Sequence, residues 1–212
     1  MHDNKVELIG TYGGDETNAL SAWTSTSREL TDEKRGRIGK LLKMLAENNH
    51  GTPFEKSSAH WLITCDLASH VHLIKHRIAS VNAESARYKE LKDDKFYIPQ
   101  DWSNDEQALL ITHCEESLRK YHECLTRLVA TGVPKKRAKE SARFYLPYSN
   151  QITADVMMNF RAFMNFINLR HSEHAQLEIR NIAKQMLILV YETGQFNLSL
   201  EAFGWTKEKI YQ

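Results

Sequence analysis

The period of the hydrophobic pattern changes along the chain and predicts a succession of strands and helices. Residues 6–12 alternate loosely and end at Gly13-Gly14, which predicts a first strand followed by a turn. Residues 151–155 allow a further short strand. Between residues 59 and 65, the odd positions predict the buried face of a strand: Ala59, Trp61, Ile63 and Cys65.

Several other segments repeat their apolar residues with the spacing of a helix. One helix opens at Thr31 and ends at Asn48, and a short helix covers about residues 68–77. The longest helix starts at a capping box, Ser103-Asn-Asp-Glu106, and stops at Gly132. Three more helices are predicted over residues 135–144, over residues 157–170 and from Ser172 onward.

This mixture of strands and helices predicts an α/β protein of the α+β kind. A length of 212 residues is enough to bury a substantial core. No internal repeat, low-complexity linker or change in composition marks a second domain, so we expect residues 1–212 to form a single domain. Its centre is expected to be a mixed or antiparallel sheet flanked by long helices.

Composition and charge argue against several classes of partner. The 28 Lys and Arg residues balance 27 Asp and Glu residues to a net charge of +1, so no global field favours nucleic acid or an anionic membrane. The first residues lack the apolar core of a signal peptide, and no apolar run reaches the length of a membrane span. We therefore expect a cytoplasmic protein without membrane or nucleic-acid partners.

The three cysteines are odd in number and widely scattered, as is typical of free thiols in a reducing compartment. Cys65 alternates with apolar residues, and Cys114 and Cys124 stand beside glutamates. A neighbouring carboxylate raises the pKa of a thiol, so a cysteine nucleophile is not expected.

The densest cluster of candidate binding groups lies between residues 75 and 88. Lys75, His76 and Arg77 are consecutive groups that can carry positive charge, and Ser85 and Arg87 add a hydroxyl and a guanidinium fork. Such a fork binds phosphate in a bidentate way. The segment predicts a local anion site, although a basic, solvated helix end followed by a polar loop has the same charge pattern.

A second informative stretch lies on the helix predicted over residues 157–170. Arg161, Asn165 and Asn168 are one turn apart and share a face. Asn is a mediocre helix former, so its repeated use indicates a polar ligand surface, with helix capping and solvated positions as the alternative.

These stretches and two others resemble the motifs of the flavin-dependent thymidylate synthases, the ThyX family. They occur in the order and at the spacing of that family, which is more specific than any single motif. The matching stretches are Lys75-His76-Arg77 with Ser85 and Arg87-Tyr88, His50-Gly-Thr-Pro-Phe-Glu55, Ala142-Arg143-Phe-Tyr-Leu146-Pro147, and the block from Asn159 through Arg170 to Arg180.

The resemblance implies a ThyX-like fold and two sets of site residues. The set that binds FAD is His50, Thr52, Glu55, Lys75, His76, Arg77, Ile78, Asn159, Arg161, Asn165, Leu169 and His174. The set that binds dUMP is Lys75, Ser85, Ala86, Arg87, Arg143 and Arg170. Ser85 and Arg170 are the candidate catalytic residues, because Ser85 helps to hold the phosphate and Arg170 polarises the uracil carbonyl.

By this resemblance the chain is an FAD-dependent thymidylate synthase that converts dUMP to dTMP. Methylenetetrahydrofolate supplies the carbon, NADPH supplies the hydride, and the enzyme is a homotetramer whose active sites are shared between subunits.

Two departures from the family pattern leave alternatives open. Lys75 replaces the usual Arg and lacks its planar fork. Ala83 stands where many members have Glu, with Glu84 adjacent. The alternatives are a related flavin enzyme that hydroxymethylates a pyrimidine nucleotide, and a nucleotide-binding module without turnover.

Metal and conventional nucleotide motifs are not expected to contribute. His70 and His72 are two residues apart, but no carboxylate or cysteine completes a coordination sphere at a recognisable interval. The sequence has neither a Walker loop nor a Rossmann glycine fingerprint, so a flavin has to be held by side chains.

Overall fold

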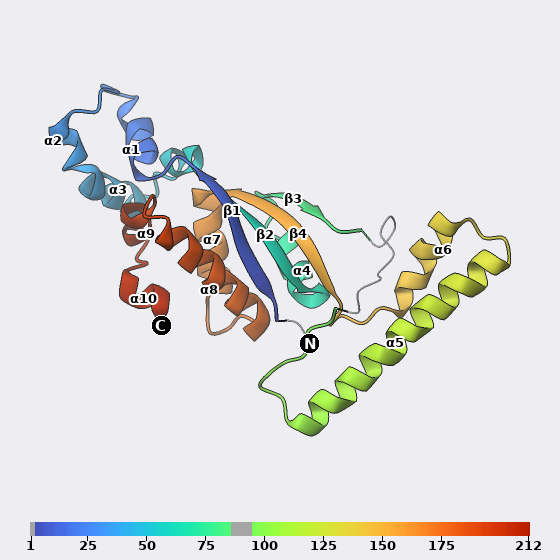
Figure 1. Cartoon of the computed structure of the whole chain (residues 1–212). Helices are drawn as coiled ribbons and strands as arrows, with labels where there is room; N and C mark the ends of the chain where they lie inside the picture. The colour runs from blue at the N-terminus through green and yellow to red at the C-terminus, as the bar shows by residue number, and fades with distance from the viewer. Residues whose placement is uncertain (1–2, 86–94) are drawn as a thin grey trace. The chain divides into compact units, whose positions relative to one another are not determined.

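The computed structural model describes residues 3–85 and 95–212. These residues form two compact units, which are described separately (Figure 1). The first unit holds Asp3 and Asn4, Thr64–His72 and the described part of Asn82–Ala154. The second unit holds Lys5–Ile63, Leu73–Val81 and Asp155–Gln212. Within the described ranges, no helix combines the length and the apolar character needed to cross a membrane.

Four strands pair in one antiparallel sheet in the order β1-β2-β4-β3. β1 (Lys5–Tyr12) and β2 (Ser58–Asp66) confirm the two strands predicted from alternation. β3 (Ser80–Ala83) is absent from the predicted elements because it is only four residues long and mostly exposed, which is too short to establish a period. The four buried positions predicted in β2 are between 0% and 5% exposed: Ala59, Trp61, Ile63 and Cys65.

The boundary between β4 (Gln151–Asn159) and α7 (Phe160–Arg170) corrects one prediction. Residues 157–159 lie in the strand rather than in the predicted helix, because buried and exposed side chains keep alternating there. Asn159 is extended, and its side chain accepts a hydrogen bond from the Ala162 N–H at 2.8 Å. This is an N-cap, so α7 begins directly after Asn159.

Most helices of the second unit differ from the predicted ranges. The helix predicted from Thr31 is divided at Gly36 and Arg37, and the Thr31 hydroxyl caps its first part by accepting from the Lys34 N–H. The helix predicted from Ser172 begins five residues later. The observed helices are α1 (Asp15–Trp23), α2 (Asp32–Arg35), α3 (Ile38–Glu47), the 3-10 helix η1 (Thr52–Lys56), α8 (Leu177–Glu192), α9 (Asn197–Ala202) and α10 (Lys207–Tyr211).

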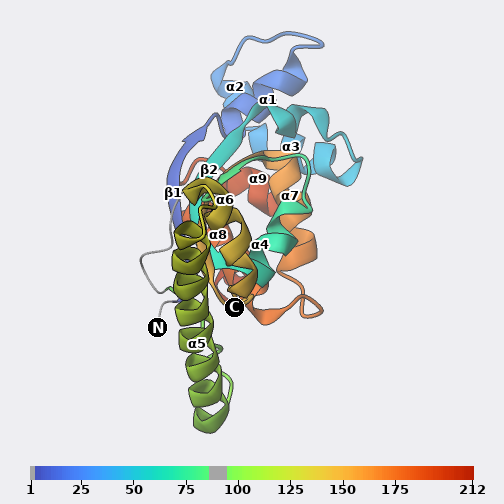
Figure 2. The same cartoon turned by 90° about the vertical axis from the view of Figure 1, so that its right-hand side faces the viewer.

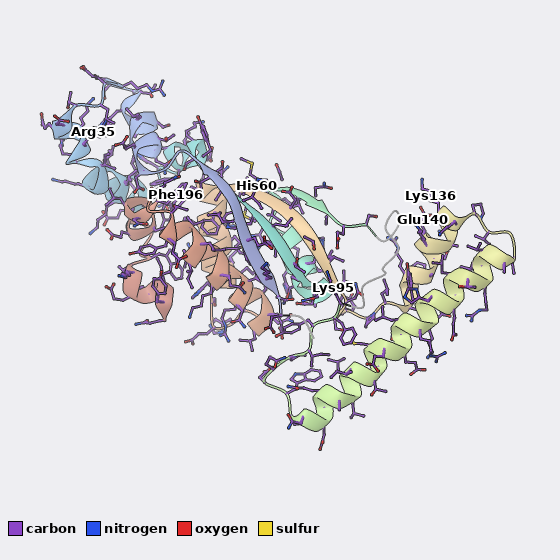
Figure 3. All side chains as sticks on the ribbon, in the orientation of Figure 1. Arg35, His60, Lys95, Lys136, Glu140 and Phe196 are labelled. Carbon is purple, nitrogen blue, oxygen red and sulfur yellow. The ribbon has the colours of Figure 1, made fainter. Side chains whose placement is uncertain are left out.

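Buried phenylalanines connect these helices. Phe196, labelled in Figure 3, stacks on Phe160 with ring centroids 5.3 Å apart. Phe54 of η1 lies 6.1 Å from Phe160 and contacts the edge of Phe203 at 4.9 Å. Aromatic pairs of this kind stabilise a core beyond the area that they bury. Around this cluster α8 packs against β1 and α7, and α3 packs against α9.

The first unit contains a helical hairpin of α5 (Asn104–Ala130) and α6 (Lys135–Ala142), followed by the 3-10 helix η2 (Arg143–Tyr145). Figure 2 shows α5 and α6 side by side, as Figure 1 does. The predicted cap is confirmed, because the Ser103 hydroxyl accepts from the Glu106 N–H. The apolar residues of α5 are buried mainly from Cys114 onward, and Leu109 near its start is 64% exposed. The buried residues between the helices are Tyr121, Leu125, Ala138 and Ala142.

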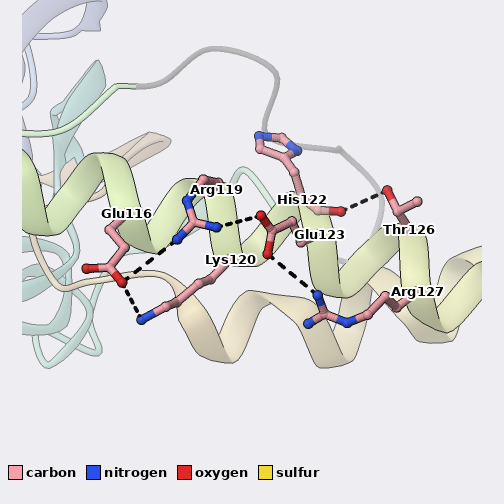
Figure 4. A network of polar contacts seen from close by, with 7 residues as sticks. All are labelled: Glu116, Arg119, Lys120, His122, Glu123, Thr126 and Arg127. Carbon is pink, nitrogen blue, oxygen red and sulfur yellow. Dashed lines mark hydrogen bonds and ion pairs between the residues drawn. The ribbon is translucent and has the colours of Figure 1, made fainter.

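The outer face of α5 carries a chain of exposed ion pairs (Figure 4). Glu116 pairs with Lys120 at 2.8 Å, and its pKa is lowered by that hydrogen bond. Arg119 pairs with Glu123 at 2.6 Å, which also contacts Arg127 at 3.5 Å. Exposed pairs of this spacing contribute about 0.3–0.5 kcal/mol each, so this face is a solvated one that modestly stabilises the helix.

A buried polar network connects α1 to α9. The Asp15 carboxylate accepts hydrogen bonds from the Leu198 N–H at 2.9 Å and from the Ser199 N–H at 2.7 Å, and it also accepts from the Ser199 hydroxyl. Asn18 donates to the same hydroxyl and accepts from Ser57. Burial raises the pKa of Asp15, and the hydrogen bonds oppose this shift. Asp15 thus caps a helix 183 residues away in sequence, and α9 has no side-chain cap of its own.

We predict that Asp15→Ala destabilises the protein by about 1–3 kcal/mol, because buried donors lose their acceptor. Urea denaturation of the variant is the measurement. Asp101→Ala is the matched control, because Asp101 is exposed, and it should leave the free energy of unfolding unchanged. Equal stability of the Asp15 and Asp101 variants contradicts the assigned role of Asp15.

Candidate active site

A cavity of about 600 Å³ in the second unit gathers side chains from three separate segments. Its size is in the usual range of small-molecule sites. The residues that line it are Glu55, Lys75, His76, Arg77, Ile78, Asn159, Arg161, Ala162, Asn165, Leu169 and Arg170.

Helix α7 supplies one wall of this cavity. Arg161, Asn165 and Leu169 are spaced four residues apart and therefore lie on the same face, and each is exposed. The opposite face of α7 is buried: Phe160, Phe163, Met164, Phe166 and Ile167 are all at most 2% exposed. Asn168, predicted to share the polar face, instead accepts a hydrogen bond from the indole N–H of Trp205 at 3.3 Å.

A second wall follows directly after α4 (Leu67–Ile74). The helix was expected to continue to about residue 77, but it ends at Ile74, so residues 75–78 form an irregular segment. This segment places Lys75, His76 and Arg77 along the cavity. Ile78 is also part of the wall and is 74% exposed.

The charge of the cavity is predominantly positive. Lys75, Arg77, Arg161 and Arg170 face a single carboxylate, Glu55. Arg161 Nη1 lies 2.7 Å from Glu55 Oε1, and the two side chains are 55% and 36% exposed. An exposed pair contributes at most about 1 kcal/mol to stability. The arrangement therefore suits an anionic ligand better than it explains folding stability.

Arg170 and His76 form the most specific polar contact in the cavity. Arg170 Nε donates a hydrogen bond to His76 Nε2 at 3.0 Å, across 94 residues of sequence. The imidazole packs its edge against the buried ring of Phe166, with ring centroids 4.9 Å apart. This contact holds the guanidinium of a candidate catalytic residue against a ring that is itself fixed by the core.

A second cavity of about 790 Å³ adjoins the first through a shared residue, because Arg161 lines both. His50 and Thr52 line this second cavity, as does Gly51. A Cβ atom at Gly51 would lie 2.5 Å from Arg161 Nε. The Arg161 guanidinium can therefore pack this closely only because residue 51 is a glycine. The hydroxyl-rich segment at residues 21–26, with Trp23, forms another wall and was not predicted as a site.

Some predicted residues are not among those that line the two cavities. His174 lies in the turn between α7 and α8 and lines neither cavity. Ser85 and Arg143 belong to the first unit and are not among the lining residues. Ala86 and Arg87 lie outside the described residues. Ala162, which no motif indicated, lines the first cavity because it follows Arg161 in the first turn of α7.

Two of the three cysteines are buried in the described part of the chain. Burial raises the pKa of Cys65 to about 12, and Asp66 adds to this effect. Burial also raises the pKa of Cys114, whose sulfur lies 3.0 Å from the Ser149 hydroxyl. No group of three His, Cys, Asp or Glu side chains in residues 3–85 and 95–212 is arranged to hold a metal ion.

A family model described as thymidylate synthase complementing protein matches residues 7–193. The relatives most similar in sequence include flavin-dependent thymidylate synthases from Pseudothermotoga lettingae and Kosmotoga olearia, which are 35% and 33% identical. Each alignment covers 84% of this chain, and it covers 80% and 81% of the relatives. The chain belongs to the flavin-dependent thymidylate synthase family.

Solved structures agree with this assignment. A UMP/dUMP methylase PolB from Streptomyces cacaoi, bound with 5-Br dUMP, superposes with a TM-score of 0.80 at 29% identity and covers 96% of both chains. The same protein bound with 5-Br UMP gives a TM-score of 0.75 at 27% identity, covering 97% of each chain. The predicted flavin-dependent thymidylate synthase fold, a sheet with flanking helices, is therefore confirmed.

We predict that the native enzyme reacts with iodoacetamide at Cys124 alone. Cys65 and Cys114 are buried, and burial raises the pKa of both thiols. Modification is located by peptide mass spectrometry, and denatured protein, in which all three thiols should react, is the control. Rapid alkylation of native Cys65 contradicts this prediction.

Proposed function

We propose that the chain catalyses the FAD-dependent reductive methylation of dUMP to dTMP, with methylenetetrahydrofolate as carbon donor and NADPH as reductant. The observation that carries this proposal is the first cavity. Ten residues predicted to bind flavin or dUMP, from segments up to 115 positions apart (Glu55 to Arg170), line one hollow of suitable size. A solvated basic helix end does not account for such convergence.

The donor set of the cavities fits FAD. Guanidinium and amide groups from Arg161, Asn159 and Asn165 match the carbonyl, ring nitrogen and phosphate acceptors of a flavin dinucleotide. An FAD that contacted all predicted residues requires both cavities, since His50 and Thr52 line the second one. Arg161 lines both cavities, which supports a ligand that extends from one cavity to the other.

In the proposed mechanism, Asn159, Arg161 and Asn165 would help to hold the flavin, and a bound flavin would supply the redox chemistry of the reaction. The protein supplies placement and charge. The Arg170 guanidinium donates to a uracil carbonyl and stabilises negative charge that develops on the ring. Ser85, Arg87 and Arg143 hold the phosphate of dUMP.

The assembly and domain organisation remain predictions that belong to this proposal. We propose a homotetramer with active sites shared between subunits, and a single catalytic domain over residues 1–212. We assign the enzyme to the cytoplasm.

A second candidate function is the methylation of UMP. The methylase from Streptomyces cacaoi is described as acting on UMP and dUMP, and it was solved with a brominated form of each. Lys75 and Ala83 also keep the hydroxymethylase alternative open. The two questions are separate, since one concerns the sugar of the substrate and the other concerns the group that is added to the base.

We predict that the purified protein carries a flavin absorbance spectrum that NADPH bleaches, and that it converts dUMP to dTMP. The protein is incubated with NADPH, methylenetetrahydrofolate and either dUMP or UMP, and products are identified by mass spectrometry. A methylated product from dUMP supports the proposal, and a hydroxymethylated one replaces it. Flavin-free protein that binds nucleotide without product identifies a binding module.

We also predict that Arg170→Ala weakens dUMP binding at least tenfold, since a charge-assisted hydrogen bond contributes about 1.5–3 kcal/mol. Calorimetry measures nucleotide affinity, and the flavin spectrum should be retained. Arg37→Ala is the control, because Arg37 is exposed and lies outside both cavities. If Arg170→Ala binds dUMP as tightly as this control, Arg170 does not contact the nucleotide.

A further inference from the structure

The contact between His76 and Arg170 carries an inference beyond the two separate roles predicted for these residues. His76 was expected to support flavin, and Arg170 was expected to hold uracil. In the structure the two side chains bind each other, through Arg170 Nε and His76 Nε2 at 3.0 Å. The bond is partly buried, and a hydrogen bond to a charged donor is stronger there than in open solvent.

The chemistry of the two groups fixes the state of the imidazole. Arg is always protonated, so its Nε carries a hydrogen and can only donate. His76 Nε2 must then provide a lone pair, which places the ring in its neutral form with the proton on Nδ1. A histidine in this tautomer is an acceptor toward Arg170 and adds no charge of its own to a cavity that already contains four cations.

The geometry also determines which Arg170 nitrogens remain for a ligand. Only Nε of its guanidinium has a hydrogen-bond partner within residues 3–85 and 95–212. The two terminal nitrogens form the planar fork that can bind a carbonyl oxygen in a bidentate way. His76 packs against the ring of Phe166, which is 0% exposed. The hydrophobic core therefore holds the His76 imidazole, which accepts the hydrogen bond from Arg170.

We propose that His76 is a positioning residue for Arg170: its neutral Nε2 accepts from Arg170 Nε and thereby aims the two terminal nitrogens at the uracil ring. The inference rests on the proposed nucleotide role of Arg170. It assigns His76 to orientation of the substrate-binding arginine, in addition to any contact with the cofactor. A guanidinium held in this way loses less rotational freedom when the nucleotide binds.

The test is a double-mutant cycle in the flavin-loaded enzyme. His76→Phe keeps a ring that can pack on Phe166 but removes the acceptor. His76→Gln keeps an acceptor oxygen near the position of Nε2. Arg170→Lys keeps the positive charge but has no Nε group. For each variant, dUMP affinity is measured by calorimetry, kcat and KM are measured separately, and the flavin spectrum reports cofactor content.

We expect His76→Phe to lower kcat/KM for dUMP about tenfold per flavin-loaded active site, and His76→Gln to recover most of this loss. In the Arg170→Lys background the same His76→Phe change should have no further effect, because the group through which His76 acts is already absent. Equal losses in both backgrounds would overturn the proposal, as would full activity of His76→Phe.

A readout independent of turnover separates this inference from the proposed function. Nitrogen-15 NMR of the histidine rings should show His76 as the neutral tautomer with the proton on Nδ1 in the wild-type protein, and Arg170→Lys should abolish that signature. If the tautomer is present but dUMP neither binds nor reacts, the proposed function fails while the pairing stands. If dUMP reacts but His76 is charged or protonated on Nε2, the positioning role is wrong.

Discussion

The candidate site depends on the division of helix α7 into two faces. Five apolar side chains on one face are at most 2% exposed, and burying each contributes about 1.5–3 kcal/mol, so the rotation of the helix about its axis is strongly determined. Arg161, Asn165 and Leu169 are on the other face, and this rotation of the helix places them along the cavity. The cap at Asn159 sets where the helix starts, and with it the phase of every later residue.

The polar contacts within the two units differ in what they contribute. The Asp15 network is partly buried and joins α1 to α9, so it stabilises the second unit. The Glu55–Arg161 pair and the pairs along α5 are largely exposed and contribute little to stability. A cavity with four cations and one carboxylate is electrostatically unfavourable without a ligand. Its composition is explained by binding, which agrees with membership of a nucleotide-modifying enzyme family.

Several residues predicted for the site line the two cavities, because the motifs that contain them are local. Lys75-His76-Arg77 was singled out by its consecutive charged groups, and the His50–Glu55 segment by its resemblance to the ThyX family. Glu55, Lys75, His76 and Arg77 line one cavity. His50 and Thr52 line the adjoining one. The segment with Trp23 was missed, since an isolated aromatic residue among hydroxyls has no distinctive period. The hydrogen bond between Asn168 and Trp205 could not be predicted from the sequence either, because Trp205 lies 37 residues further along the chain.

The sequence by itself determined the alternation of β2, the cap at Ser103 and the identity of the charged groups, since each depends on neighbours a few positions away. Only the tertiary structure decided that β4 continues to Asn159 and that α4 ends at Ile74, leaving residues 75–78 free to line the cavity. It also paired His76 with Arg170 across 94 residues. The physical reason is that periodicity records which side of an element is apolar, whereas the partner of each side chain depends on how separate elements pack.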